Sequence, residues 1–397
     1  MTVLTPDVRR RLIQRVMATS TWPELRALER EIARDYAATP EQRAMNEAEL
    51  TWLRPIAAAR HYFLGVISSA VAALSRWIVP CLAVAAVAAG VVAEPVQTPD
   101  VRLADEVNPL AGRPFYVDPI SKAMNASHGD PSSPQLAYVA NTPQAYWLDQ
   151  AFSAGAVTGV VARLTGAAQA AGATPVLTLY AIPHRDCGCY AAGGFGSGDA
   201  YRQWVDAVAA GLGGAPAAII VEPDALAMAD CLSGDQRQER FDLIRYAVDS
   251  LTRDPAAAVY VDAGHSRWVS ADEMANRLNQ AGIDHARGFS LNTTNYYSTE
   301  EEIGYGDAIS GMTGGKHYVI DTSRNGAGPA PDSPLSWCNP DGRALGTPPT
   351  TDTASPNADA YLWVKRVGES DGSCNGGPGA GQFVNQFAID LARNAGQ

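Results

Sequence analysis

Short apolar runs rich in β-branched residues alternate with amphipathic stretches of helical length through residues 107–397. We predict strands at 114–118, 174–180, 217–222, 257–262, 287–292, 317–321 and 361–365. We predict helices over roughly 141–171, 199–212, 235–253, 271–281 and 381–394. Apolar strands separated by helices of this length indicate an α/β fold with a parallel sheet covered on both faces. About seven strands in succession favour a barrel over an open sheet.

Acidic side chains lie at or just beyond the carboxyl ends of at least five predicted strands. They are Asp186, Glu222 with Asp224, Asp262, Asp321 and Asp371. In a parallel barrel the carboxyl ends of the strands share one face, and active sites are built on that face. A single Asp after a strand is often only a helix N-cap. Five such positions, with aromatic and Arg side chains among them, favour an active site.

The charge distribution argues against a nucleic-acid partner. The net charge is −12, but residues 1–93 carry 11 Arg and 8 acidic residues, whereas the remainder carries 19 basic and 34 acidic residues. A surface this acidic offers no basic patch that could neutralise phosphates and release counterions. Apolar residues make up 46% of the chain and charged residues 18%, which is typical of a globular protein.

The first 93 residues differ from the rest. Residues 1–60 have a charged, amphipathic helical pattern. Residues 61–93 are apolar, and their last 17 residues carry no charge, which suits a short membrane span or a signal peptide preceded by Arg76. A signal anchor, a signal cleaved after Ala93 behind a long tail, and translation starting at Met45 all stay open, with a buried core helix as the alternative. The first three predict a linker at 94–106 and a secreted or membrane-anchored domain outside the cytoplasm.

Cysteine usage agrees with export. Outside the apolar run, which contains Cys81, five cysteines remain: Cys187, Cys189, Cys231, Cys338 and Cys374. Five cysteines form at most two disulfides, and disulfides are the default use of cysteine in exported proteins. The closely spaced Cys187 and Cys189 could suggest a metal or redox site. No His/Cys cluster of zinc spacing accompanies them, so we expect neither a metal nor a cofactor.

Four separated motifs carry a family resemblance. They are YAIPHRDC (180–187) with AAGG (191–194), VEPD (221–224), DAGH (262–265) with Trp268, and WVK (363–365) with GESDG (368–372). In this order they resemble glycoside hydrolase family 6, the cellulase family B, and the resemblance covers about 107–397. The sequence departs from the usual pattern at Thr178, where valine is common. It departs again at Cys189 and Ala192, in a stretch that often carries a serine.

The chemistry of acetal cleavage points to the same residues. It needs a proton for the leaving oxygen and stabilisation of an oxocarbenium-like carbon. A carboxylic acid donates at neutral pH only if apolar surroundings or a neighbouring carboxylate raise its pKa. Asp224, at the end of an apolar strand, suits this role. The resemblance implies that Asp224 is the general acid, that Asp186 influences its ionisation and that Asp371 is the base. It also implies that Tyr180 distorts the sugar ring and that Arg185 lies beside the carboxylates.

The resemblance further implies the sugar contacts and the disulfides. Trp268 and Trp337 match sugar-stacking tryptophans, because the C–H-rich face of glucose packs on aromatic rings. Polar contacts to the sugar are implied for Asp262, His265, Asn295, Lys365 and Glu369. The implied disulfides are Cys187–Cys231 and Cys338–Cys374, which leaves Cys189 as a thiol. Three further tryptophans lie inside helix or strand patterns and are interpreted as core: Trp147, Trp204 and Trp363.

We therefore expect residues 107–397 to form a distorted, seven-stranded-like parallel β/α barrel. As a monomer without metal or cofactor, it would hydrolyse internal bonds of β-1,4-glucan with inversion. Only 38 residues separate Asp186 from Asp224, which leaves little loop for a roof and favours an endoglucanase over a cellobiohydrolase. A non-catalytic glucan-binding homologue and a membrane-anchored scaffold are the rivals. A binding module, however, would not need Asp186, Asp224 and Asp371 together.

Overall fold

Seven parallel strands form one sheet in the order β1 to β7 in the computed structural model, which describes residues 107–397. The strands are β1 (Tyr146–Asp149), β2 (Val176–Tyr180), β3 (Ala217–Val221), β4 (Ala257–Asp262), β5 (Gly288–Leu291), β6 (His317–Asp321) and β7 (Ala358–Leu362). The predictions for 1–60, 61–93 and 94–106 lie outside the described residues. Because β1 and β7 are the two edges, the barrel is open between them, which confirms the predicted distorted barrel.

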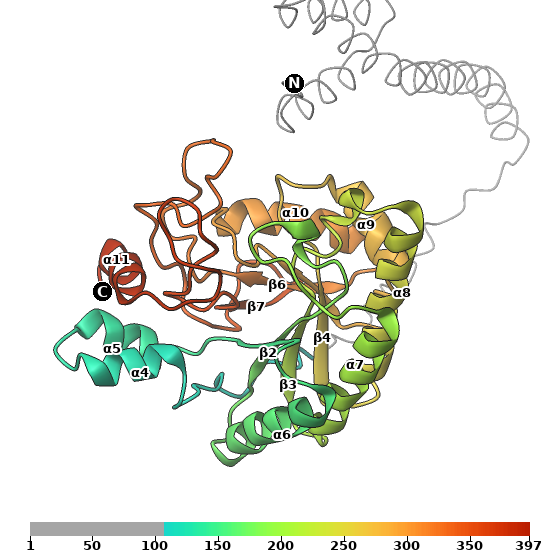
Figure 1. Ribbon diagram of the computed structural model, residues 1–397, viewed down its shortest axis with the longest axis horizontal. Coiled ribbons are helices and arrows are strands. Elements are labelled where there is room, and N and C mark those ends of the chain that lie inside the picture. The colour runs from blue at the N-terminus through green and yellow to red at the C-terminus, as the bar shows by residue number, and fades with distance from the viewer. Residues whose placement is uncertain (1–106) are drawn as a thin grey trace, which may run out of the picture. The chain divides into compact units, whose positions relative to one another are not determined.

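Two helices precede β1, and the others lie between strands or follow β7. The helices are α4 (Lys122–Gly129), α5 (Pro134–Asn141), α6 (Ala154–Ala170), α7 (Gly198–Leu212), α8 (Gly234–Leu251), α9 (Ala271–Gln280), α10 (Thr299–Met312) and α11 (Asn385–Asn394). Helices α6 to α10 follow one another around the outside of the curled sheet (Figure 1). Within residues 107–397, no helix combines the length and the apolar character that crossing a membrane requires.

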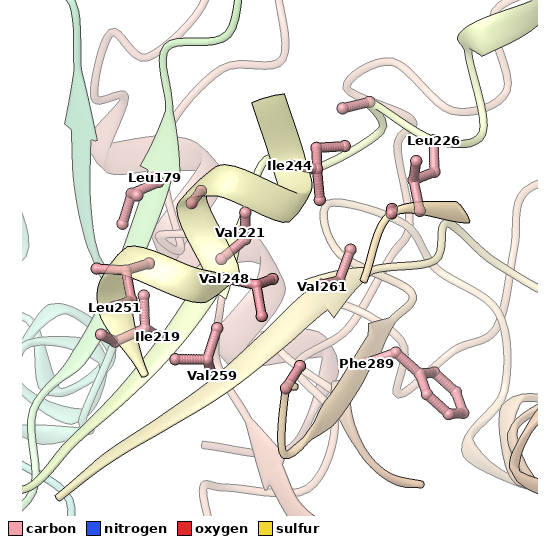
Figure 2. Packing of buried hydrophobic residues seen from close by; sticks show 14 of the residues in the cluster. Leu179, Ile219, Val221, Leu226, Ile244, Val248, Leu251, Val259, Val261 and Phe289 are labelled. Carbon is pink, nitrogen blue, oxygen red and sulfur yellow. The ribbon is translucent and has the colours of Figure 1, made fainter. Parts of the chain in front are cut away.

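The main core lies between the sheet and its outer helices. Figure 2 shows strand residues such as Ile219 and Val259 facing Ile244, Val248 and Leu251 of α8, all of them fully buried. Each such side chain contributes about 1.5–3 kcal/mol through burial. A second cluster fills the inside of the barrel, where small residues such as Ala218, Ala258 and Ala360 pack beside larger ones.

Several predicted elements were wrong, for local reasons. The helix predicted at 141–171 is the strand β1 followed by α6, because Ser153 starts the helix and the four-residue strand before it is too short to show alternation. The strand predicted at 114–118 is a single bridge between Phe115 and Thr174. The last strand lies at Ala358–Leu362 and not at 361–365.

Three helices were missed, α4, α5 and α10. Helix α10 was not predicted because it contains glycines, and each glycine lowers helix propensity. One of them, Gly306, is required by packing, because a Cβ there would lie 2.8 Å from the ring of Tyr318.

Candidate active site

The carboxyl ends of the strands bring the predicted acidic residues together, as the parallel topology requires. Asp186 follows β2, Asp224 follows β3, Asp262 ends β4 and Asp371 follows β7. Asp224 interacts electrostatically with the other three. Glu222 is buried nearby, and its carboxylate accepts hydrogen bonds from the backbone N–H groups of the two residues after β2.

The turn after β3 holds Asp224 in a constrained conformation. Glu222 (φ 53°) and Asp224 (φ 68°) both have left-handed backbones on either side of Pro223, which is uncommon for residues other than glycine. The hydrogen bonds to Glu222 fix one side of this turn. The backbone N–H of Asp224 donates to Oδ1 of Asp262 across 2.9 Å and fixes the other side. The turn therefore presents the Asp224 side chain at a set position.

The surroundings of Asp224 favour its protonated form. Loss of water around the carboxyl is the largest cause, and the charges of Asp262 and Asp186 add to it, so the pKa of Asp224 lies well above its ordinary value. Burial also raises the pKa of Asp262, to about 6. A carboxylic acid that keeps its proton near neutral pH can donate it to a leaving group.

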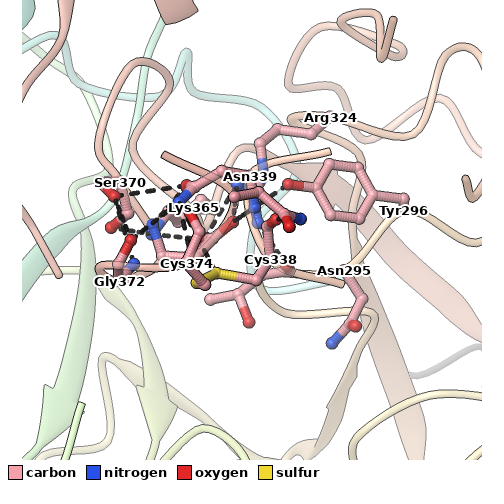
Figure 3. A network of polar contacts seen from close by, with 12 residues as sticks. Asn295, Tyr296, Arg324, Cys338, Asn339, Lys365, Ser370, Gly372 and Cys374 are labelled. Carbon is pink, nitrogen blue, oxygen red and sulfur yellow. Dashed lines mark hydrogen bonds and ion pairs between the residues drawn. A yellow bond between two sulfur atoms is a disulfide. The ribbon is translucent and has the colours of Figure 1, made fainter. Parts of the chain in front are cut away.

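Asp371 has the opposite environment. Arg324 Nη1 lies 3.0 and 2.9 Å from its two oxygens, and Lys365 Nζ lies 3.0 Å from Oδ1. The hydroxyl of Tyr296 and the backbone N–H of Asn339 donate to Oδ2. Figure 3 shows the four residues that bind Asp371, which are Arg324, Lys365, Tyr296 and Asn339, lying close together. Burial alone would raise the pKa of Asp371, but the two cations outweigh it and hold the pKa well below its ordinary value. The pKa values of the two carboxyl groups are thus shifted in opposite directions, upward for Asp224 and downward for Asp371.

Asp186 lies on a loop that Arg185 organises. Asp186 Oδ2 accepts a 2.6 Å hydrogen bond from the backbone N–H of Ala191. Burial raises the pKa of this carboxyl, and the Ala191 N–H and Arg185 partly oppose that effect. The Arg185 guanidinium lies 4.3 Å from the centre of the Tyr180 ring and donates to the Tyr180 carbonyl. Arg185 thus contacts Tyr180, and its charge acts on the carboxyl of Asp186.

The predicted sugar-binding residues fall into two groups. Trp268 and Trp337 keep 39% and 41% of their surfaces exposed, so their rings are available for stacking. The polar residues are buried, and each has partners in the protein. Lys365 pairs with Asp371, and Glu369 pairs with Lys122 and Arg366. Asn295, His265 and Asp262 are buried as well, and Asp262 supports the backbone of Asp224.

Some residues at the site were missed or misread from the sequence. Trp204 and Trp363 are buried, as expected, but Trp147 is only half-buried, and its ring lies edge-on to Tyr180 at 5.1 Å. Trp147 is the second residue of β1, which pairs with β2, so recognising that strand could have placed it near Tyr180. Arg324 was also missed as a partner of Asp371, although it lies three residues beyond the end of β6.

Both disulfides that the resemblance implies are present. Cys187–Cys231 joins the loop after β2 to the loop after β3, and Cys338–Cys374 closes the segment that carries Asp371. Cys189 belongs to neither disulfide. Within residues 107–397 no three His, Cys, Asp or Glu side chains gather so that they could hold a metal ion.

Comparisons with known proteins agree with this geometry. Endoglucanase A of Cellulomonas fimi is 49% identical over 284 residues, which are 71% of this chain and 61% of that protein. Endoglucanase A of Thermobispora bispora is 44% identical over 71% of this chain and 62% of its own length. The chain thus spans about three fifths of the length of these two relatives.

A solved structure covers the described part of the chain. It is the endoglucanase Cel6 from Mycobacterium tuberculosis in complex with methyl-cellobiosyl-4-deoxy-4-thio-β-D-cellobioside. It is 73% identical and has a TM-score of 0.72. The match spans 73% of this chain and 100% of that structure's chain. The model of the family described as Glycosyl hydrolases family 6 matches residues 108–395. The chain belongs to glycosyl hydrolase family 6.

Proposed function

We propose that residues 107–397 hydrolyse internal β-1,4-glucosidic bonds of cellulose-type glucan with inversion of the anomeric carbon. The observation that carries the proposal is the pairing of two carboxyl groups with opposite ionisation on one face of the barrel. Asp224 keeps a proton, and Asp371 is held as an anion by Arg324 and Lys365. Protonating the leaving oxygen and stabilising an oxocarbenium-like carbon need one group of each kind.

Asp224 gives its proton to the glycosidic oxygen as the bond to the anomeric carbon breaks. A water molecule attacks the opposite side of that carbon and gives its proton to Asp371, and exchange with solvent then returns a proton to Asp224 and removes the one on Asp371. Asp371 orients this water and places a negative charge near the developing positive charge. Because its ion pairs make it a weak base, orientation and charge contribute more than proton affinity. Asp186 supports the raised pKa of Asp224.

The sugar chain is held by the exposed tryptophans. Trp268 and Trp337 stack on pyranose faces, and the partly exposed Trp147 lies beside Tyr180, where a ring at the cleavage point would be bound. Tyr180 is held by the Arg185 guanidinium, and this rigid contact lets it press that ring out of its relaxed shape. The structure solved with a thio-linked cello-oligosaccharide, at 73% identity, supports a glucan as ligand.

Endo action is favoured over exo action by the relatives. Those that are 39–49% identical are named endoglucanases, whereas a relative from Neosartorya fischeri named a probable cellobiohydrolase is 29% identical. The test is hydrolysis of carboxymethyl cellulose, followed by viscosity and by reducing ends. Endo action should lower the viscosity steeply for few new ends. A slow fall in viscosity would indicate the cellobiohydrolase alternative, and no new ends at all would indicate a non-catalytic glucan-binding protein.

We also propose that residues 61–93 direct residues 107–397 across a membrane, either as a cleaved signal or as an anchor. The two disulfides support this, because such bonds persist in oxidising compartments. Fractionation of the producing cell, together with N-terminal sequencing of the natural product, tests it. Enzyme found only in the cytoplasm would contradict the proposal.

A further inference from the structure

The segment after β4 carries two residues expected at the sugar, His265 and Trp268, and it is attached to the start of α10. The attachment centres on Ser266. Its backbone N–H donates to Glu302 Oε1 across 3.0 Å, and its hydroxyl lies 2.7 Å from that same oxygen. The hydroxyl also lies 2.8 Å from Oε1 of Glu301. The segment 263–268 is thus held at its middle by two adjacent glutamates.

The two glutamates have different partners. Glu301 forms a two-bond ion pair with Arg267, at 2.7 and 2.8 Å, and this pair holds the pKa of Glu301 below its ordinary value. Glu302 is fully buried, and the contacts of its Oε1 are the neutral groups of Ser266. Its second oxygen, Oε2, is buried without a hydrogen-bond partner in the described part of the chain. An ionised carboxylate in such a place is costly.

The geometry at Ser266 also favours a protonated Glu302. A serine hydroxyl has one proton, so it can donate to only one of the two carboxylate oxygens beside it. If both glutamates were ionised, two negative oxygens would compete for that proton. If Glu302 carries a proton, its O–H donates to the Ser266 hydroxyl, which then donates to Glu301. Every short contact is satisfied only in this second arrangement.

We propose that Glu302, in its protonated form, is a positioning residue that holds segment 263–268 so that Trp268 binds the sugar chain. The proposal rests on the proposed function for the identity of the ligand. The ring of Trp268 is tilted against the ring of His265 with centroids 5.2 Å apart, and His265 stacks on Tyr297 at 4.3 Å. Ser266 lies between His265 and Trp268 in the chain, so its attachment to α10 restrains both of these aromatic side chains.

The surrounding charges set the pH range of this attachment. The titratable groups around Glu302 are Glu301 and Tyr305 of α10, Asp262 of β4, His265 and Arg267 of the segment, Tyr297 before α10, and Arg277 of α9 beyond Tyr305. Burial raises the pKa of Glu302 to about 7, and Glu301 and Asp262 add to the rise. Burial lowers the pKa of His265 to about 3, so His265 stays neutral. The attachment is therefore intact below about pH 7 and weakens as the pH rises above it.

The kinetic test measures KM and kcat for cellohexaose from pH 5.5 to 8.5. In the wild type, KM should rise about threefold to tenfold above neutral pH, as expected for loss of one hydrogen bond. Glu302→Gln keeps the shape but has no titrating proton, so its KM, whatever its absolute value, should not change with pH across the range. Ser266→Ala should have a raised KM at every pH. Glu300→Gln, an exposed neighbour in the same helical turn, is the matched control and should behave as the wild type.

A measurement without ligand separates this inference from the proposed function. The fluorescence of Trp268, taken as the difference between each protein and its Trp268→Phe variant, should titrate near neutral pH in the wild type and in Glu300→Gln. It should not titrate in Glu302→Gln. An enzyme without activity on glucan would contradict the proposed function and leave this readout in place. An unchanged titration in Glu302→Gln, or a KM that rises equally in that variant, would overturn the role of Glu302.

Discussion

The backbone N–H of Asp224 donates a hydrogen bond to Oδ1 of Asp262, across 2.9 Å. The same oxygen accepts from the N–H of Gly264, and Oδ2 accepts from the hydroxyl of Ser290. A buried carboxylate thus fixes the backbone of the proposed acid, and its charge raises the pKa of that acid. Asp262 is buried among these partners, so we place it beneath the acid and not against the sugar.

Replacing this carboxylate should separate its two effects. In Asp262→Asn the amide oxygen can still accept from the Asp224 N–H, but the negative charge is gone, so the pKa of Asp224 should fall. The alkaline limb of kcat/KM would then move to lower pH, with reduced activity at neutral pH. A pH profile of kcat/KM on cellotetraose measures this, with melting temperature as the control for folding. A limb that does not move would show that Asp262 has no electrostatic effect on the acid.

Removing the acid itself should depend on the leaving group. Asp224→Ala should lower kcat on carboxymethyl cellulose by about 10²–10⁴, the usual contribution of a positioned general acid. On a cellobiosyl fluoride the loss should be far smaller, because fluoride leaves without a proton from a carboxylic acid. Initial rates on both substrates give the comparison. Equal losses on the two would mean that Asp224 has a structural role.

The sequence predicted the strands best where each is a continuous apolar run. The strands β2 to β6 were all placed to within a few residues, because they are buried on both faces and contain many β-branched or aromatic residues. The edge strand β1 was missed because its four residues resemble the helix that follows. The helix α10 was missed because the pattern cannot show that Gly306 is needed to accommodate Tyr318.

The sequence predicted those site residues whose motifs come soon after a strand. Asp224 and Asp371 belong to short motifs that come after strands β3 and β7. The charge of Asp371 acts on the carboxyl of Asp224. The partners of Asp371 were not predictable in the same way. Arg324 comes from the loop after β6, and its bond to Asp371 depends on how two loops pack. Long-range polar contacts of this kind have no local signal in a single sequence.

Arg324 should be needed to keep Asp371 ionised. Both side chains are nearly fully buried, and breaking such a pair by removing one partner costs about 3–5 kcal/mol of stability. In Arg324→Gln the pKa of Asp371 should rise, so its charge would be lost as the pH falls and an acid limb absent from the wild type should appear in kcat. Urea unfolding and a pH profile from 4 to 7 measure the two effects. Arg393→Gln, which removes an exposed ion pair, should change neither.

The two disulfides should each contribute substantially to stability. Their cysteines are separated by 44 and 36 residues, and in the chain-entropy model each such loop contributes about 4 kcal/mol. Replacing Cys187 and Cys231 together by serine should lower the free energy of unfolding by roughly this amount. Peptide mapping without reduction should recover the pairs Cys187–Cys231 and Cys338–Cys374. Recovery of Cys189 in a disulfide would contradict the pairing.

The first product should be the α-anomer. In a single displacement, water attacks the face opposite the leaving group, and the two carboxyl groups stand ~6.5–9.5 Å apart to admit it. A retaining enzyme instead needs a nucleophilic carboxylate ~5 Å from the acid. Asp371 is held by Arg324, Lys365, Tyr296 and Asn339, and a carboxylate with this many partners is poorly placed to form a covalent bond. Proton NMR of early product, before mutarotation, decides the outcome, and an initial excess of the β-anomer would overturn both the inverting mechanism and the role of Asp371.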